Sequence, residues 1–333
     1  MAVGGDAALF SGSDDGVVRR FAIGDPAQAP EVVGTFGAGV RALALGKDGW
    51  LAAGSTTGEV RLWGPGENGP APRSLVSSGA PVVALAFAPF QPLLAAAAKD
   101  GSVRVWDLER PEAPPLSITT GGAAIASLVF GPRRFEGGVP TTDRTLLAGT
   151  PKGALLWQLA RPEAPPVTVC GSSDVRGIAF SPRLDLLACG ERNGGIVVQP
   201  FAGLFPGGGV QRFVGHASSV NALAFGPRGE SLVSASSDGT VRLWNARNKA
   251  APPVVLSGHE SWVWSVAFAP DGEHLVSGGA DRTVHVWPAS GEAMAREICA
   301  RGYPPLSKEE WRSFLPEDLP YHPERACAGL DRE

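Results

Sequence analysis

A nine-residue phrase recurs along the whole chain and limits its fold more than any other feature. The best-formed copy is SSDGTVRLW at 236–244, and the other copies start at residues 13, 55, 98, 150, 191 and 279. Aligned on Phe21, Trp63, Trp106, Trp157, Gln199, Trp244 and Trp287, the copies are 42, 43, 51, 42, 45 and 43 residues apart. A period of about 40–45 residues with a tight turn, a strand and a terminal aromatic is typical of a four-stranded propeller blade. The sequence therefore predicts an all-β fold, a seven-bladed β-propeller of four-stranded blades.

The repeat unit at 216–258 shows how one blade forms. Val220–Phe225 alternates apolar and polar residues as an inner strand does, and Ser231–Ser236 follows after a turn as the second strand. Asp238–Gly239 then predicts a hairpin, because Gly tolerates the positive φ that such turns require. Thr240–Trp244 and Val254–Leu256 complete the blade as third and fourth strands.

The two ends of the repeat region are less regular. The first repeat begins near Leu9 in its second strand, so Met1–Val3 is at best a stub of its inner strand. The final repeat offers three strands (Val263–Phe268, His274–Gly278 and Thr283–Trp287) and no evident fourth. Either Arg296–Arg301 supplies that strand or upstream sequence is missing. We expect a propeller domain over 1–289 with an incomplete first blade.

Residues 290–333 break the period and form a C-terminal tail. Ser307 and Glu310 make a capping box, which predicts a short helix over 308–315. Trp311, Phe314 and Leu315 share one face of this helix, so we expect the tail to pack on the propeller.

Composition excludes several classes of protein. An apolar content of 44% allows a large core, and a net charge of -4 gives no reason to expect nucleic acid as a partner. The longest apolar run, Leu93–Ala98, is too short to cross a bilayer, so no membrane association is expected. The four cysteines are too few and scattered for a disulfide scaffold, and Cys170 and Cys189 are expected as small buried residues. A cytoplasmic protein is the simplest interpretation, and a Cys299–Cys327 bridge is not expected there.

The repeats resemble the WD40-repeat β-propeller family over about residues 1–289. The resemblance is carried by Gly215–His216, by Gly258–His259 and by the Trp106–Asp107 dipeptide. In that family a His, a Ser or Thr, an Asp and a Trp of one blade form a hydrogen-bonded set. The resemblance implies two such structural sets, which are His216, Ser234, Asp238 and Trp244, and His259, Ser277, Asp281 and Trp287.

The tail also carries a resemblance. Its order of EEW, FL, LPY and a cysteine is similar to the ending of many bacterial WD-repeat proteins. In those, the propeller is often the C-terminal part of a larger signalling chain with a kinase, an NTPase switch or a protease-like module. This resemblance implies a bacterial regulatory or signalling role.

The sequence contains no recognisable catalytic motif. The chain lacks the phosphate-binding GxxxxGK[ST], the GxSxG elbow and the HExxH and CxxC metal spacings. His274 and His285 fall in predicted strands of the last blade, and no ligand role is expected for them or for His322. We therefore predict a non-enzyme with no cofactor and no metal.

Binding residues are predicted at the narrow face, where inner strands begin. Counting four residues back from the last apolar residue of each inner strand gives Arg41, Val83, Ala126, Arg176, Asn221 and Trp264. The residues before the hairpin Asp or its equivalent (Lys99, Arg192 and Ser237) should lie at the same rim, as should Trp262. From these we predict the partner-binding residues Arg41, Lys99, Arg176, Arg192, Asn221, Trp262 and Trp264. The longer loop Gly131–Thr145 is a second candidate surface.

Two functions fit these residues. One is a non-catalytic interaction scaffold or sensor that binds a protein or peptide. The four basic residues among them, Arg41, Lys99, Arg176 and Arg192, suggest that this partner carries an acidic loop. The other is a propeller enzyme such as a hydrolase with a metal in the channel. The six inner-strand positions favour the scaffold because none of them is a carboxylate.

Overall fold

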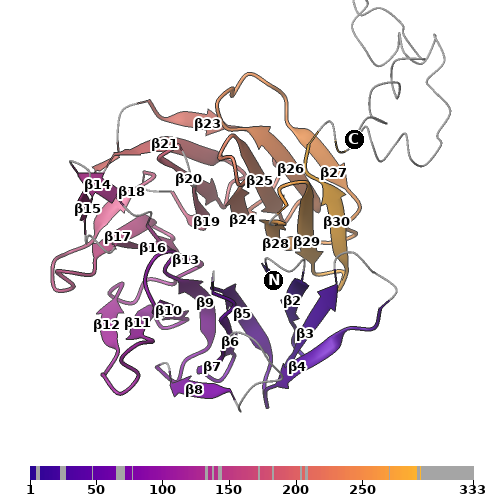
Figure 1. The fold of residues 1–333 in the computed structure, drawn as a ribbon. Helices are drawn as coiled ribbons and strands as arrows, with labels where there is room; N and C mark the ends of the chain where they lie inside the picture. Colours follow the sequence, from indigo (N-terminus) through magenta and orange to yellow (C-terminus); the bar gives the residue numbers. More distant parts are fainter. Residues whose placement is uncertain are drawn as a thin grey trace, which may run out of the picture.

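Seven antiparallel sheets form a ring, and each sheet is one blade of a β-propeller (Figure 1). The computed structural model describes residues 1–4, 8–22, 28–46, 48–64, 72–76, 78–131, 134–136, 139–141, 145–171, 173–181, 184–202, 205–206, 209–269, 271–290 and 293. The predicted fold class is therefore confirmed. The helix predicted over 308–315, the 290–333 tail packing and the Cys299–Cys327 pair lie outside the described residues.

The first three blades follow the chain without interruption. Blade 1 contains β1 (Ala2–Val3), β2 (Ala8–Gly12), β3 (Val17–Ala22) and β4 (Glu31–Thr35). Blade 2 contains β5 (Val40–Leu45), β6 (Leu51–Ser55), β7 (Glu59–Trp63) and β8 (Arg73–Val76). Blade 3 contains β9 (Val82–Phe87), β10 (Leu93–Ala98), β11 (Ser102–Asp107) and β12 (Leu116–Thr119).

Blades 4 and 5 carry short additional strands. Blade 4 contains β13 (Ser127–Phe130), β16 (Thr145–Thr150), β17 (Gly153–Gln158) and β18 (Val167–Val169). Its first loop forms a separate hairpin of β14 (Arg134–Glu136) and β15 (Val139–Thr141), which explains the 51-residue spacing. Blade 5 contains β19 (Val175–Phe180), β20 (Leu186–Glu191), β21 (Ile196–Ala202) and β23 (Gln211–Phe213), and β22 (Phe205–Pro206) pairs with the end of β21.

The last two blades carry the best-formed repeats. Blade 6 contains β24 (Val220–Phe225), β25 (Ser231–Ser236), β26 (Thr240–Asn245) and β27 (Val254–Ser257). Blade 7 contains β28 (Val263–Phe268), β29 (His274–Gly279) and β30 (Val284–Pro288), and no fourth strand among the described residues.

Strand register confirms the alignment of the repeats. In every blade the third-strand residue used for alignment is paired with a leucine of the second strand. These pairs are Phe21–Leu9, Trp63–Leu51, Trp106–Leu94, Trp157–Leu146, Gln199–Leu187, Trp244–Leu232 and Trp287–Leu275. Gln199 therefore occupies an aromatic position in a blade that otherwise keeps the pattern.

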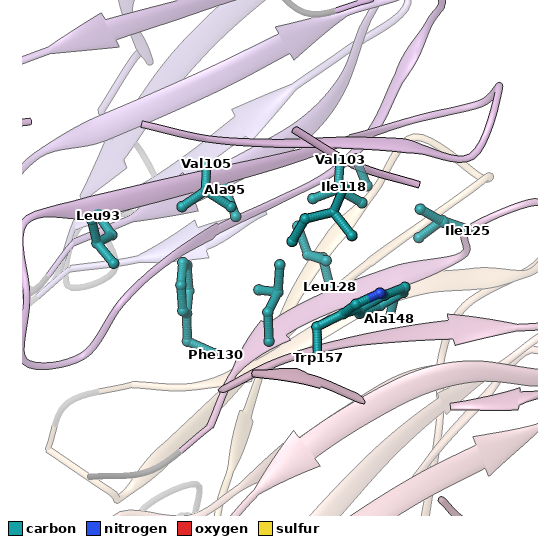
Figure 2. Packing of buried hydrophobic residues seen from close by; sticks show 12 residues of the cluster. Leu93, Ala95, Val103, Val105, Ile118, Ile125, Leu128, Phe130, Ala148 and Trp157 are labelled. Atoms are coloured by element: carbon teal, nitrogen blue, oxygen red, sulfur yellow. The ribbon is translucent and has the colours of Figure 1, made fainter. Parts of the chain in front are cut away.

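The hydrophobic core lies between blades. Buried clusters fill the six junctions from blade 1–2 to blade 6–7. In the cluster between blades 3 and 4, Phe130 points toward Leu93 and Val105 of the neighbouring blade (Figure 2). Second strands such as Leu93–Ala98 are buried at every residue, because a blade lies against each of their faces.

The ring closes between blades 7 and 1. The stub β1 is the inner strand of blade 1 and pairs with β2, as the sequence predicted for Met1–Val3, and it also contacts β28 of blade 7. A Cβ on Gly278 would lie 2.7 Å from the Met1 sulfur, so the Met1 side chain fills space at this junction. Valines fill the comparable space elsewhere, with Val82 against Gly54 and Val220 against Gly190. Whether Arg296–Arg301 adds the fourth strand of blade 7 lies outside the described residues.

One cysteine expectation is corrected. Cys170 and Cys189 are both buried, as predicted, but they form a disulfide. Cys170 directly follows the outer strand of blade 4, and Cys189 lies in the second strand of blade 5. Repeat packing brings these two positions together, which cysteine spacing alone does not reveal. Among the described residues, no helix has the length and hydropathy that a membrane span requires.

Candidate functional site

A β-bulge marks the start of the inner strand in five blades. The bulge leaves one residue outside the regular pairing, and these residues are Arg41, Val83, Arg176, Asn221 and Trp264. A bulge redirects the side chain it carries and interrupts the ladder. The five residues are among the six positions counted from the sequence. The sixth, Ala126, directly precedes β13 and donates its N–H to the Gly149 carbonyl.

In the five blades that have this bulge, a backbone hydrogen bond brings two further residues close to the bulge residue. The hairpin residue between the second and third strands donates its N–H to the carbonyl two residues before the bulge residue. The donor and acceptor pairs are Thr56–Gly39, Lys99–Pro81, Arg192–Asp174, Ser237–Ser219 and Ala280–Trp262, at 2.8–2.9 Å. We call these residues the rim. The rim consists of the bulge residues, the residues two positions before them and the hairpin residues. The seven residues predicted as a binding surface all belong to it.

Carboxylates at the rim neutralise part of its positive charge. Arg41 pairs with Asp14 of blade 1 at 3.3 Å. Arg176 and Arg192 share Asp174, at 2.9 and 3.5 Å. Neither acid was predicted from the sequence, and both leave less positive charge available to a partner than the four basic residues suggest. Asp174 stands two residues before Arg176, as Trp262 does before Trp264, so the same counting rule would have found it.

A shallow pocket of about 380 Å³ opens at the rim of blade 5. Its lining residues are Ser173, Asp174, Glu191, Arg192 and Asn193. Glu191 is fully buried, and its charge is compensated by Arg212 of β23, which donates to both carboxylate oxygens at 2.6 and 3.2 Å. Glu191 occupies the position of Ser236 in blade 6, so the repeat pattern gave no sign of this ion pair.

Asn221 connects the rims of blades 6 and 7. Its side-chain amide donates to Ser237 Oγ within its own blade and to the Val263 carbonyl of blade 7, both at 2.9 Å. Its own neighbours therefore hold this side chain, which fixes the position of β28 beside β24.

Trp262 and Trp264 form an aromatic pair at the rim of blade 7. They are 54% and 50% exposed, and their rings meet edge to face with centroids 5.5 Å apart. Such a geometry is the favoured one for two aromatic rings. Each ring limits the freedom of the other, and both keep large apolar surfaces in contact with solvent.

The structural set of blade 6 forms as the family resemblance implied. His216 lies 2.7 Å from both Asp238 Oδ2 and Ser234 Oγ, and Trp244 Nε1 donates to Ser234 Oγ at 2.8 Å. Burial lowers the pKa of His216 despite its Asp238 partner. Burial by itself would raise the pKa of Asp238, but hydrogen bonds from Thr240 and His216 outweigh it and hold this pKa at about 2. The set therefore contains a neutral imidazole that donates from Nδ1 to an ionised carboxylate.

Blade 7 repeats this arrangement. His259 lies 2.8 Å from both Asp281 and Ser277, and Trp287 donates to Ser277 at 2.8 Å. Trp287 is only half-buried, whereas Trp244 is 3% exposed. Both sets join the hairpin to the segment before the inner strand, so they hold the scaffold behind the rim.

Comparison with known proteins identifies the repeats. The family model "WD domain, G-beta repeat" matches residues 72–107, 208–245 and 251–288, which cover the second and third strands of blades 3, 6 and 7. The crystal structure of the WD40 β-propeller domain of Doa1 is similar over 88% of this chain and 92% of that chain, with a TM-score of 0.71 and 19% identity. No curated protein sequence matches significantly. The fold and these matches define a seven-bladed β-propeller that contains WD40 repeats.

Proposed function

We propose that this chain is a non-catalytic interaction scaffold or sensor that binds a protein or peptide across the rim of blades 5, 6 and 7. The observation that carries the proposal is the solvent-exposed Trp262–Trp264 pair. WD40 propellers generally serve as protein-interaction scaffolds, which supports the general class. Tryptophan is among the residues that most often dominate binding energy at interfaces.

The three blades offer different chemistry along one arc of the rim. Trp262 and Trp264 supply an apolar anchor at blade 7, and blade 5 supplies the pocket beside Arg192. Arg192 is 67% exposed in its side chain and shares Asp174 with Arg176, so it keeps capacity for a further carboxylate. An extended segment with an apolar side chain at one end and an acidic one at the other would fit this arc.

The inner-strand positions favour a scaffold over a propeller hydrolase. A divalent ion in the channel would need several oxygen ligands there. The six positions counted from the sequence carry arginine, valine, alanine, arginine, asparagine and tryptophan instead. Asn221, the one amide among them, donates to Ser237 and Val263.

The finer assignment rests on sequence alone. The order of EEW, FL, LPY and cysteine in the tail supports a bacterial regulatory role, within a larger signalling chain or beside one. A cytoplasmic location is proposed from the short apolar runs and the few, scattered cysteines of the sequence. The 131–145 loop is a second surface proposed for the same partner or another.

The experiment is affinity capture from the source lysate, followed by a binding measurement with the purified partner. We expect the Trp262→Ala/Trp264→Ala double variant to bind about 30-fold more weakly or worse, since truncation of an interface anchor costs about 2 kcal/mol or more. Val255→Ala is the control, because Val255 is 46% exposed and lies on β27, the outer strand of blade 6, whereas the rim lies at the start of the inner strands. Arg41→Glu tests whether the surface extends to blade 2. Unchanged affinity in the double tryptophan variant would refute the proposed surface.

A further inference from the structure

Blade 7 differs from blade 6 at one position beside the histidine of its structural set. Ser277 is paired in register with His285, as Ser234 is with Arg242 in blade 6. Both side chains cover the glycine of the preceding Gly–His pair. A Cβ on Gly258 would lie 3.4 Å from His285 Cε1, and one on Gly215 would lie 2.5 Å from Arg242. Blade 7 therefore holds an imidazole where blade 6 holds a guanidinium, which has no lone pair to offer a metal.

Three metal-binding side chains meet at this position. His259 Nδ1 lies 2.8 Å from Asp281 Oδ2, and the rings of His259 and His285 have centroids 4.4 Å apart. One ligand atom from each of His259, Asp281 and His285 lies within 4.8 Å of the others. In the part of the chain that the structure describes, this is the one group of three such side chains.

The surroundings leave the group accessible on one side. The side chains of His259 and Asp281 are almost fully buried, whereas His285 is half-buried on β30. Among the described residues, β30 is the last strand of its sheet, at the outside of the ring in Figure 1. An ion from solvent would thus meet His285 first and the two buried ligands behind it.

We propose that His259, Asp281 and His285 bind a divalent transition metal ion, with Zn²⁺ as the best match. Two imidazoles and one carboxylate are ligands that Zn²⁺ prefers, at about 2.0–2.2 Å from each ligand atom. Ligand atoms around a tetrahedral ion lie about 3.3–3.5 Å apart. The His259–Asp281 pair, at 2.8 Å, therefore opens by about 0.5 Å, and the accessible His285 ring moves inward by about 1–1.5 Å. Water completes the coordination.

The ion takes the place of the proton between His259 Nδ1 and Asp281, and the ring proton moves from Nδ1 to Nε2, so that the imidazole stays neutral and no net proton is released. His259 Nε2 then carries the ring proton and donates it to Ser277 Oγ, which lies 2.8 Å away. Such a hydrogen bond on the second ring nitrogen is the usual way in which a protein orients a histidine ligand. The metal would fasten β30 to the segment before β28, without using the rim.

The alternative is that His285 serves packing alone, because its ring stacks on Trp287 with a centroid distance of 5.0 Å.

Metal titration distinguishes the two roles of His285. Untagged, chelator-treated protein is titrated with Zn²⁺ by calorimetry, and with Co²⁺ by visible absorption. We expect one ion per chain and the absorption bands of tetrahedral Co²⁺. His285→Arg restores the blade 6 residue and should weaken Zn²⁺ binding about tenfold or more.

Two control variants separate this site from other histidines. His274→Asn removes the exposed pair that His274 forms with Asp271 at 2.8 Å, and His322→Asn removes the histidine of the tail. Both should bind Zn²⁺ like wild type. His285→Gln is measured beside His285→Arg, with circular dichroism to confirm folding of each. Absence of stoichiometric uptake, or uptake that survives both His285 variants, would overturn the proposal.

Discussion

Ser234 is the residue on which the blade 6 hydrogen-bond set depends. Its hydroxyl donates to His216 Nε2 and accepts from Trp244 Nε1, and both rings are almost fully buried. His216 Nε2 and Trp244 Nε1 therefore both depend on Ser234 for a hydrogen bond, and both rings have little access to water. Blade 7 has the same bonds around Ser277, but its Trp287 is half-buried, so solvent reaches part of that set.

The paired substitutions Ser234→Ala and Ser277→Ala test this difference. Ser234→Ala leaves a buried acceptor and a buried donor unpaired, at about 1–3 kcal/mol for each group. Ser277→Ala should lower the free energy of unfolding less, because water can replace the lost partner of Trp287. Urea denaturation of both variants beside wild type measures the difference. Equal losses would show that the exposure of Trp287 does not matter.

At the scale of the strands, small residues set how closely blades approach. A Cβ on Gly54 of β6 would lie 2.8 Å from the Val82 Cβ of the next blade. The same close approach joins Gly190 to Val220. Interiors packed to this density have no room for an added methyl group unless a strand moves.

Gly54→Ala should therefore destabilise the protein by about 1–3 kcal/mol, the usual cost of overpacking a core. Gly37→Ala is the matched control, since no atom lies within 4 Å of its Cβ position and its φ is not positive. That variant should have nearly unchanged stability. The measurement is the free energy of unfolding of both variants. A neutral Gly54→Ala would show that β6 and β9 can separate without cost.

The strands were predictable from sequence because each repeat encodes its own local pattern. The period-two alternation and the Asp–Gly turns of blade 6 place its four strands almost to the residue. Counting within an inner strand also located the bulge residues Arg41 and Trp264. Contacts between repeats were not predictable in this way. The Arg41–Asp14 and Glu191–Arg212 pairs join segments whose proximity depends on packing and on substitutions outside the repeat pattern.

At the scale of the whole ring, stability is shared among neighbouring blades. Each blade buries its faces against the next, and stub β1 with Met1 provides this contact for blade 7. In such repeat architectures the total stability is roughly a sum of repeat and interface contributions. A covalent bond across one junction therefore adds to the noncovalent contacts of the ring. Cys170–Cys189 is that bond, between blades 4 and 5.

Reduction of this disulfide, or Cys189→Ala, should lower the free energy of unfolding by about 2–4 kcal/mol. The bond closes a segment with a sequence separation of 19 residues, for which loss of chain entropy in the unfolded state gives about 3 kcal/mol. Denaturant melts with and without reductant measure the effect, and Cys189→Ala should be insensitive to reductant. Peptide mapping without reductant, on protein taken directly from its source, shows whether the bond forms there. A reducing cytoplasm keeps such thiols free, so a linked Cys170–Cys189 peptide would argue against the cytoplasmic location proposed from sequence.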